Sequence, residues 1–313
     1  MMKLGWMLTA GVTSGFALGF VILSEEAHAP VHGAIAWATG DSGECDLWSM
    51  LRAPYRISRL RRSSGLSGVQ TRLVETVSDG FMRWETPIGS LWVPPGNSPA
   101  FVVGEQMSEV YTLPPMTLGP TDVVLDCGAN YGSFVRICLR QGVRKVIAIE
   151  PDPLNVEALR RNFAREIETG QVVIVGKGVW HEDATLPMYA YRASVLDSFV
   201  MPQRREAGTE KPRRVNLPLT TIDSIVEELR LQAVTFIKMD IEGAERNAIR
   251  GAAGTIRRFR PRMSLATENL ADDYIAVPQE VRKVDANYRK ECGLCKQTGF
   301  FGYRPEILYF TPQ

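Results

Sequence analysis

The stretch "DVVLDCGANYG", residues 122–132, decides the fold class of this 313-residue chain. It is a run of apolar, mostly β-branched residues that ends at an acidic residue and continues into a glycine-rich turn. Glycine at positions 128 and 132 lets a backbone turn sharply and approach a ligand closely. A helix-like stretch, "YGSFVRICLRQG", follows. The pattern therefore predicts a buried strand, a tight turn and a helix.

The same alternation continues along the chain. Further apolar strand candidates are "KVIAIEPD" (145–152), "QVVIVGKGVW" (171–180), "VTFIKMD" (234–240), "PRMSLATEN" (261–269) and, closing the chain, "FFGYRPEILYF" (300–310). Helical spacing lies between them in "PLNVEALRRNFAREI" (153–167), "TTIDSIVEELRL" (220–231) and "AERNAIRGAAGTIRRF" (244–259). Short buried strands alternating with helices indicate an α/β fold, a parallel sheet covered on both faces. Ligands of such sheets bind at the carboxyl ends of the strands.

Composition excludes several classes of protein. Hydrophobic residues make up 45% and charged residues 23%, as in an ordinary globular protein. The formal net charge of +1 gives no reason to expect a nucleic-acid partner. Five cysteines are too few for a disulfide framework, and Cys292 and Cys295 form one CxxC where a zinc ribbon needs two. A redox pair or local disulfide there stays open beside two plain thiols.

The N-terminus departs from an ordinary soluble enzyme. Residues 4–23, "LGWMLTAGVTSGFALGFVIL", carry no charge and have the length that a helix needs to cross a bilayer. Residues 1–23 are therefore predicted to form a retained transmembrane anchor. A cleaved signal peptide ending at "AHA" (27–29) and a buried helix stay open as alternatives. Glycines at 11, 15 and 19 share one helical face, which raises a helix-mediated homodimer as a further hypothesis.

Composition divides the rest of the chain into three segments. Residues 24–68 indicate a linker with a basic segment, "RAPYRISRLRRSSGLSG". Residues 69–119 alternate like short strands broken by proline and glycine, as in "RWETPIGSLWVPP", and predict a small β-rich cap. Residues 120–313 are predicted to form the cofactor-binding domain.

Acidic side chains end the first two strands of that domain. Asp126 lies two residues before the first glycine of the turn, and Glu150 ends the second strand. A carboxylate at position 126 would repel the pyrophosphate that dinucleotides place at such a turn. It suits the ammonium and sulfonium of S-adenosylmethionine, while Glu150 can accept both ribose hydroxyls. The predicted cofactor-binding residues are Asp126, Gly128, Asn130, Gly132, Glu150, Asp152 and Asp240.

A second charged stretch, "FIKMDIEGAE" (236–245), ends the fourth strand. If the chain stays extended to Glu242, strand alternation places Lys238, Asp240 and Glu242 on one side, facing the crevice above the sheet. Asp240 is the first candidate for the base or the substrate-orienting group, and Glu242 the second. Lys238 lies deeper and is predicted to neutralise a carboxylate. The alternative is a charged network that only braces the turn, with Glu245 included.

A metal site is considered and not predicted. Asp240 and Glu268, at the end of "PRMSLATEN", offer two carboxylates, which are too few to assign a divalent ion. The three histidines show no ligand spacing, and a single CxxC gives no zinc site. No metal ligand is therefore assigned to this chain.

The motifs "VVLDCGANYGSF", "VIAIEPDP", "LTTIDSI" and "FIKMDIEGAE", in this order, resemble those of the FkbM-type S-adenosylmethionine-dependent methyltransferases. The resemblance covers roughly residues 85–313, and "TPIGSLWVPP" and "EVYTLPP" are similar to the family's lead-in. It implies a class I methyltransferase (Rossmann-like) fold, whose seven-stranded, mostly parallel sheet has one antiparallel strand. It also implies O-methylation of a hydroxyl on a sugar, glycolipid or polyketide-like acceptor.

Two other functions stay open, namely a nucleotide-dependent oxidoreductase and a membrane-anchored scaffold that keeps the fold without catalysis. Lys3 precedes the apolar run, while Glu25 and Glu26 follow it, so the positive-inside rule favours an external enzyme. S-adenosylmethionine is made in the cytosol, which favours the opposite side. A single-pass membrane protein with a cytoplasmic catalytic domain is predicted on the strength of the cofactor.

Overall fold

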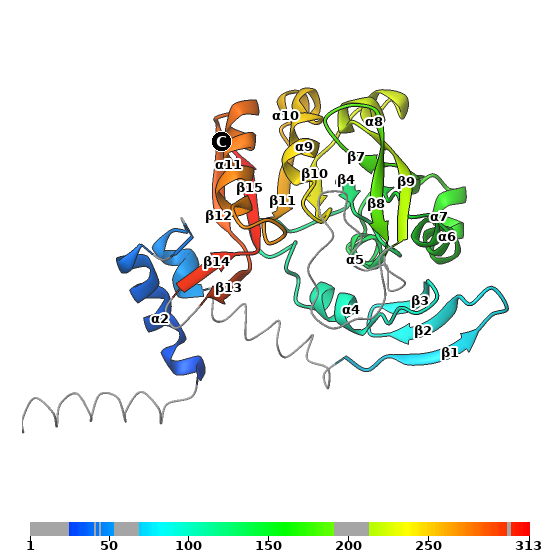
Figure 1. Ribbon diagram of the computed structural model, residues 1–313, viewed down its shortest axis with the longest axis horizontal. Helices are drawn as coiled ribbons and strands as arrows, with labels where there is room; N and C mark the ends of the chain where they lie inside the picture. The colour runs from blue at the N-terminus through cyan, green and yellow to red at the C-terminus, as the bar shows by residue number, and fades with distance from the viewer. Residues whose placement is uncertain (1–24, 41, 44, 53–68, 191–212, 299–301) are drawn as a thin grey trace, which may run out of the picture.

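A seven-stranded sheet forms the centre of the computed structural model, which describes residues 25–40, 42–43, 45–52, 69–190, 213–298 and 302–313 (Figure 1). The strand order is β12–β15–β11–β10–β4–β5–β6. The strands are β4 (Val123–Cys127), β5 (Lys145–Ile149), β6 (Val172–Val175), β10 (Phe236–Met239), β11 (Arg262–Ala266), β12 (Tyr288–Cys292) and β15 (Ile307–Pro312). Strand β15 runs antiparallel to both of its neighbours. The class I methyltransferase-like, mostly parallel α/β sheet is therefore confirmed.

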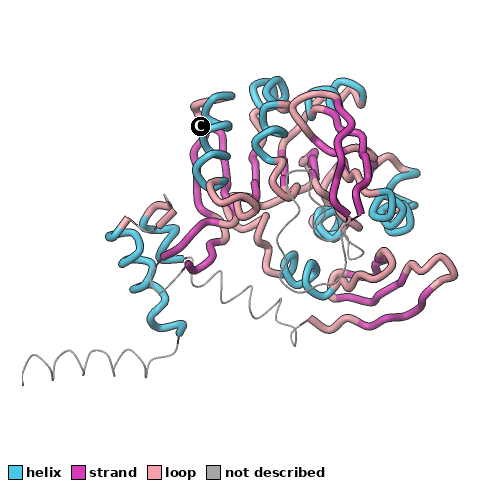
Figure 2. The backbone as a smooth tube through the Cα atoms, viewed as in Figure 1, coloured by secondary structure: helices cyan, strands magenta, loops and turns pink. Residues whose placement is uncertain are grey.

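Helices cover both faces of this sheet (Figure 2). One layer comprises α8 (Ile222–Glu228), α9 (Glu245–Arg250), α10 (Ala253–Phe259) and α11 (Asp273–Val284), and the other comprises α5 (Ser133–Arg140), α6 (Pro153–Asn162) and α7 (Ala164–Glu168). Alternate strand residues supply the two cores: Leu125 and Ile237 pack in the first, Val124 and Phe236 in the second. Every residue of β4 is buried, which explains why its sequence is apolar on both faces.

The predicted β-rich cap is present as an antiparallel sheet with one helix, which lies below the main sheet in Figure 1. Its elements are β1 (Arg72–Thr76), β2 (Met82–Thr86), β3 (Gly89–Val93) and α4 (Ala100–Met107). Asn162 of α6 holds the cap, because its side-chain oxygen accepts the Trp92 N–H at 2.6 Å and its amide donates to the Trp92 carbonyl at 2.9 Å. The cap is thus fixed to the domain that carries the sheet.

Two predicted elements are divided in the structure. The strand predicted over 171–180 separates into β6 and β7 (Gly178–Val179), and β7 joins a second sheet with β9 (Arg213–Thr220) and β8 (Ala184–Ala190). The helix predicted over 244–259 separates into α9 and α10. Asp223 explains this start of α10, since its carboxylate accepts the backbone N–H groups of Gly254 at 2.8 Å and Thr255 at 2.7 Å. Thr221 is the N-cap of α8, and its side-chain oxygen accepts the Ser224 N–H.

The cysteine expectation for 292–295 is wrong. A disulfide joins Cys45 to Cys292, 247 residues apart, and leaves Cys295 as a buried free thiol. The bond joins the segment that follows α2 (Glu25–Thr39) to the end of β12, and α2 itself lies beside β14 (Gly302–Pro305), which pairs with β13 (Cys295–Thr298) (Figure 1). Cysteine spacing alone does not specify such a partner. Disulfides persist in oxidising compartments, which counts against the predicted cytoplasmic side.

The prediction of a single-pass membrane protein is contradicted. Across the described parts of the chain, no helix combines the length and the apolar character that crossing a bilayer requires. The apolar run over 4–23, with its glycine face and the dimer hypothesis that depends on it, lies outside the described residues. The basic segment over 52–68 lies outside them too, apart from Arg52.

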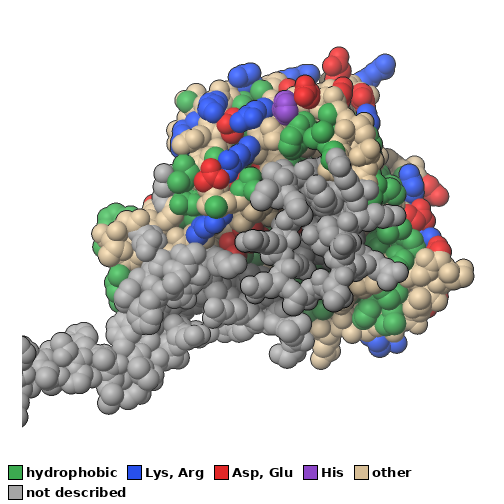
Figure 3. Space-filling view, viewed as in Figure 1, with side chains coloured by type: hydrophobic (Ala, Val, Ile, Leu, Met, Phe, Trp, Pro, Cys, Tyr) green, Lys and Arg blue, Asp and Glu red, His purple; other side chains and the backbone are tan. Residues whose placement is uncertain are grey.

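Charged side chains of both signs are interspersed over the described part of the face shown in Figure 3. Ion pairs near the surface of the cap, such as Arg72–Glu85 and Arg83–Glu75, also place positive and negative side chains next to each other. This distribution agrees with the net charge of +1. On that described surface, the mixture gives no large field of one sign, which is what electrostatic steering of a polyanion needs.

Candidate functional site

Three neighbouring strands bring the predicted acidic residues to one edge of the sheet. Strand β4 lies between β10 and β5, so the ends that carry Asp240, Asp126 and Glu150 are adjacent. The chain leaves β4 towards β5 and β6 and later returns to β10 on the other side. This reversal is the topological switch point at which open α/β sheets bind ligands.

The turn after β4 requires its glycines. Gly128 has a φ of +80°, and a Cβ there would lie 2.0 Å from the Asp240 carbonyl oxygen. Gly132 has a φ of +94°, and its Cβ would lie 2.2 Å from the ring of Phe163. The backbone of the turn therefore packs directly against the end of β10 on one side and α6 on the other. Larger residues at either position would separate these elements.

Glu150 organises the same turn from the neighbouring strand. Only 6% of the residue is exposed, and its carboxylate accepts the N–H groups of Asn130 at 2.8 Å and Asp152 at 3.0 Å. Burial raises its pKa to about 7, against the effect of these donors. The Asn155 side-chain amide also donates to Glu150 Oε1, at 3.5 Å, so Oε1 has two donors and Oε2 keeps one lone pair for a ligand.

Asn130 and Asp152 have local partners of their own. The Asn130 side-chain oxygen accepts the N–H of Tyr131 at 2.7 Å in a turn where Asn130 has a φ of +52°. Asp152 is the N-cap of α6 and accepts the Leu154 N–H at 2.6 Å. These contacts give both residues a structural role, and their contact with a cofactor stays a prediction.

Asp126 and Lys238 form a buried ion pair. The Lys238 ammonium lies 3.3 Å from Asp126 Oδ1 and donates to the Gly128 carbonyl at 3.0 Å. Asp126 is 0% exposed and Lys238 4%. Burial raises the pKa of Asp126, and Lys238 opposes this, while the surrounding carboxylates outweigh burial and raise the pKa of Lys238. The expectation that Lys238 neutralises a carboxylate agrees with this contact.

Asp240 receives a hydrogen bond from a residue that the sequence analysis missed. The hydroxyl of Tyr111, which follows the cap helix α4, donates to Asp240 Oδ2 at 2.8 Å. Burial and nearby carboxylates raise the pKa of Tyr111 well above its usual value, so the phenol keeps its proton. Tyr111 was part of the quoted "EVYTLPP", but its 129-residue separation from Asp240 gave no sign of contact.

Two more glutamates that were not predicted as site residues, Glu105 and Glu268, interact electrostatically with Asp240, and a third, Glu306, interacts with both of them. Glu105 lies on α4, Glu268 follows β11, and Glu306 precedes β15. Burial and then Asp240 raise the pKa of Glu105 to about 8. Partial burial and neighbouring carboxylates raise the pKa of Glu268, whose outer surface stays exposed and which shares a hydrogen bond with Glu306. No cluster of three or more metal-ligating side chains is found among the described residues.

Glu242 and Glu245 do not occupy the positions that strand alternation assigned beside Asp240. Strand β10 ends at Met239, and Glu242 has a φ of +55°, so the extended chain assumed up to residue 242 is wrong. The alternation that placed Glu242 beside Asp240 therefore no longer applies, and its catalytic role stays a prediction. Glu245 is 0% exposed and accepts the Ile241 N–H at 2.9 Å and the Asn269 amide at 3.1 Å. It braces the turn, as the alternative interpretation held.

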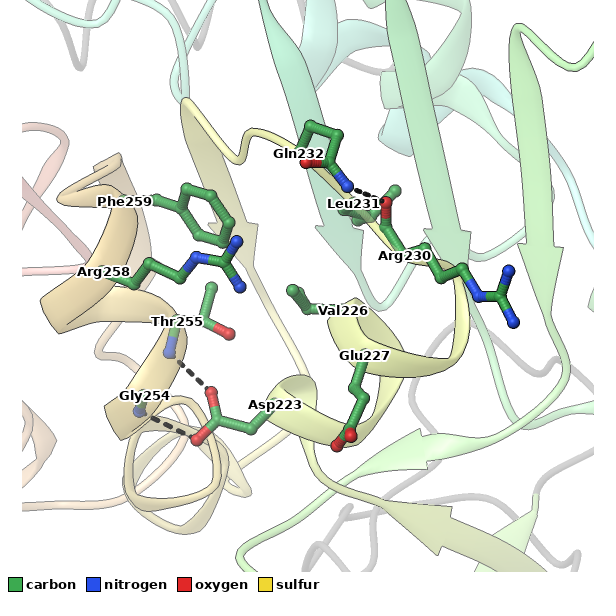
Figure 4. Close-up of a pocket in the computed structure, with 10 residues that line it drawn as sticks. All are labelled: Asp223, Val226, Glu227, Arg230, Leu231, Gln232, Gly254, Thr255, Arg258 and Phe259. Atoms are coloured by element: carbon green, nitrogen blue, oxygen red, sulfur yellow. Dashed lines mark hydrogen bonds between the residues drawn. The ribbon is translucent and has the colours of Figure 1, made fainter.

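A pocket of about 440 Å³ lies elsewhere, between α8 and α10 (Figure 4). Its walls include Val226, Leu231 and Phe259, with the exposed Arg230 and Arg258 at its rim. Leu231 lies just before β10 begins, so the pocket is near the opposite end of that strand from Asp240. Asp223 on its wall is engaged as the cap of α10. The pocket is therefore separate from the candidate site.

The solved structures whose fold is similar to that of this chain include several methyltransferases. Methyltransferase FkbM from Methylobacillus flagellatus KT is 19% identical with a TM-score of 0.45, and the match covers 68% of this chain. It covers 53% of the Methylobacillus chain, so this chain spans about half of that protein. Fibrillarin from Aeropyrum pernix, in complex with S-adenosyl-L-methionine, is 10% identical with a TM-score of 0.39 over 77% of this chain and 100% of that chain. No curated protein matches the sequence.

A protein-family comparison covers the site described above. The model of the Methyltransferase FkbM domain matches residues 126–290, from Asp126 at the end of β4 into β12. The matched segment contains Glu150, Lys238, Asp240 and Glu268, but neither the cap nor Glu306. Because the match spans more than half of the chain, this protein belongs to the FkbM methyltransferase domain family.

Proposed function

We propose that this chain is an S-adenosylmethionine-dependent methyltransferase that O-methylates a hydroxyl of a sugar, glycolipid or polyketide-like acceptor. The observation that carries the proposal is the convergence of Asp126, Glu150 and Asp240 on three adjacent strand ends at the switch point. Membership of a methyltransferase family agrees with the cofactor expected from the sequence. The division into a cap over 69–119 and a cofactor-binding domain over 120–313 belongs to the same proposal.

The residues at this edge fit that cofactor. Asp126 Oδ1 lies 3.3 Å from the Lys238 ammonium, and the buried Oδ2 lacks a hydrogen-bond partner, so Oδ2 can receive an N–H donor of an ammonium group. Glu150 Oε2 accepts one donor, the Asn130 N–H, so it keeps a lone pair for a ribose hydroxyl. Gly128 and Gly132 leave the turn without side chains, so its backbone can approach a ligand.

Asp240 is the proposed base. When bound, S-adenosylmethionine supplies an electrophilic methyl group on a sulfonium. With the cofactor in place, the Asp240 carboxylate would accept the proton of the acceptor hydroxyl, and a positioned base typically contributes about 10²–10⁴-fold. Tyr111 fixes the Asp240 carboxylate through Oδ2 and leaves Oδ1 for the acceptor.

Lys238 and Glu242 have lesser roles in this proposal. The Lys238 ammonium is engaged with Asp126 and the Gly128 carbonyl, so we assign it the positioning of the turn after β4. Glu242 lies on the turn after β10 and remains the second candidate for the base. Neither residue is needed to explain cofactor binding.

A binding measurement tests the cofactor. Calorimetric titration of the full chain with S-adenosylhomocysteine should show saturable one-site binding, whereas NAD should not bind. Preferential binding of NAD would contradict the proposal and favour the oxidoreductase alternative.

A transfer measurement tests the reaction. Methyl-labelled cofactor is supplied with a panel of sugars, glycolipids and polyketides, and label in an acceptor that resists mild base is expected for an ether product. Asp240→Asn should lower turnover by about 10²–10⁴-fold while leaving affinity for S-adenosylhomocysteine nearly unchanged. Label on nitrogen or carbon instead of oxygen would overturn O-methylation and leave the methyltransferase assignment intact.

A further inference from the structure

We propose that the pocket between α8 and α10 is a second binding site, which takes a small organic carboxylate with an apolar body (Figure 4). The pocket lies near the end of β10 that is opposite to Asp240, so it is separate from the candidate site for methyl transfer. The proposal therefore does not depend on the proposed function.

The two helices meet at Asp223 and leave a space beyond it. The Asp223 carboxylate accepts the backbone N–H groups of Gly254 at 2.8 Å and Thr255 at 2.7 Å, and a Cβ at Gly254 would lie 2.9 Å from it. The first turn of α10 is thus already capped and is not the binding group. The space of about 440 Å³ falls within the range of about 300–1,000 Å³ that small-molecule pockets occupy.

Apolar side chains form the inner wall of this pocket. Val226 and Leu231 are 6% and 7% exposed and belong to the core between the sheet and these helices. Phe259 is half-buried, packs against the same core and lines the pocket from α10. Because core packing fixes this wall, an apolar group placed against it would leave water without displacing a core side chain.

One guanidinium is directed over the apolar wall. Figure 4 shows the Arg258 side chain extending between Phe259 and Val226, whereas the Arg230 guanidinium points away from the pocket. The Arg258 Cζ lies 4.6 Å from the centroid of the Phe259 ring. Stacking on an aromatic ring holds the planar guanidinium in one orientation and leaves its N–H groups available to a ligand.

Arg258 differs from the other arginines near it. Arg250 pairs with Glu280 at 2.9 Å, and Arg257 donates to the Val284 carbonyl at 3.1 Å. Among the residues that the structure describes, no carboxylate forms an ion pair with Arg258. Its donors are therefore free to bind an anion from solution.

The charges around the pocket narrow the class of ligand. A carboxylate can accept two parallel N–H bonds from one guanidinium, while an ammonium would be repelled by it. Glu227 is exposed on the rim and, in Figure 4, points away from Arg258, so it disfavours a doubly charged phosphate more than a single carboxylate. The pocket thus fits a monoanion with a compact aromatic or branched body.

The first experiment compares three probes of one shape. Phenylacetate, phenylacetamide and 2-phenylethylamine are titrated calorimetrically into the full chain. Phenylacetate should bind at one site and about tenfold more tightly than phenylacetamide, and 2-phenylethylamine should not bind. Absence of phenylacetate binding, or equal binding of acid and amide, would overturn the proposal.

The second experiment assigns the binding to Arg258. Arg258→Gln should weaken phenylacetate binding about tenfold, and Arg258→Lys should restore only part of the affinity, because an ammonium lacks the planar fork. Arg257→Gln is the matched control, since it makes the same charge change on the same helix outside the pocket, and it should bind as the wild type does. Equal losses in Arg258→Gln and Arg257→Gln would attribute binding to net charge and remove the site.

The third experiment separates this site from the candidate site for methyl transfer. Saturation with S-adenosylhomocysteine should leave the affinity for phenylacetate unchanged. Competition between the two ligands would place phenylacetate in the candidate site and overturn the proposal. Failure of S-adenosylhomocysteine to bind, with phenylacetate binding intact and dependent on Arg258, would overturn the proposed function and leave this site standing.

Discussion

The carboxyl groups on the two halves of the sheet edge have different neighbours. On the β4–β5 half, Glu150 accepts two backbone N–H groups and Asp126 lies 3.3 Å from an ammonium. On the β10–β11 half, Asp240 has Tyr111 as its donor but interacts electrostatically with Glu105 and Glu268, on which Glu306 also acts. In the first half, the carboxyl groups have hydrogen-bond donors or an ammonium as neighbours. In the second half, their neighbours include other carboxyl groups.

This difference indicates two functions at one edge. A carboxyl group held by protein donors is fixed in one orientation, which suits recognition of a constant partner such as a cofactor. Carboxyl groups that raise one another's pKa change charge when a ligand arrives, which suits proton transfer or selection of a cation. The predictions below change one half at a time.

The largest effect is expected from Lys238→Met. The variant leaves Asp126 buried without its cation, and breaking a buried pair in this way costs about 3–5 kcal/mol of unfolding free energy. Guanidinium denaturation followed by circular dichroism measures this loss.

A double variant provides the control for Lys238→Met. Lys238→Met with Asp126→Leu removes both charges and should recover most of the stability, because apolar residues often replace buried pairs at little cost. If the double variant is as unstable as the single one, the ion pair is not the cause.

A smaller effect is expected for Glu150→Gln on cofactor binding. The amide keeps one acceptor oxygen but loses the charge and one of the two acceptors, so affinity for S-adenosylhomocysteine should fall by about 1.5–3 kcal/mol. Calorimetric titration measures the change. Glu157→Gln, on the neighbouring α6 and partly exposed, should bind as the wild type does. An unchanged affinity in Glu150→Gln would remove Glu150 from the cofactor contacts.

The pH dependence of stability is expected to distinguish Glu105. Its pKa is raised from an ordinary 4.5 to about 8, so its protonated form is favoured by folding. The stability it contributes is fully present below about pH 4.5 and is lost as the pH rises towards 8. Glu105→Gln should therefore be close to the wild type in stability at pH 5 and exceed it at pH 8, by roughly 3–4 kcal/mol if the full pKa shift is expressed.

Urea denaturation at pH 5 and pH 8 measures this difference. Glu168→Gln serves as the control, because that exposed side chain should shift stability equally at both values. If Glu105→Gln instead becomes less stable relative to the wild type as the pH rises from 5 to 8, Glu105 is ionised in the folded protein and the expected pKa shift is wrong.

The sequence predicted the β4–β5 half better than the other half. Strand runs and glycine spacing are local signals, so Asp126, Gly128 and Glu150 could be placed from residues near them. Tyr111, Glu105 and Glu306 reach the site through contacts between distant segments, and the Tyr111–Asp240 bond joins residues 129 apart. The disulfide at Cys45 was missed for the same reason. Glu242 was misplaced because the end of β10 depends on a turn that alternation does not reveal.

The smallest effect on the cofactor is expected from Tyr111→Phe. The change removes the 2.8 Å hydrogen bond to Asp240 and keeps the ring, which packs edge-on against Phe134 and 5.2 Å from the Lys238 ammonium. Loss of one such bond should cost about 0.5–1.5 kcal/mol of unfolding free energy. Because Tyr111 belongs to the acceptor half, affinity for S-adenosylhomocysteine should stay within about twofold of wild type, well below the change for Glu150→Gln. The two variants titrated side by side decide the division of the edge: equal losses of affinity would place the cofactor against Tyr111 and leave no separate acceptor half.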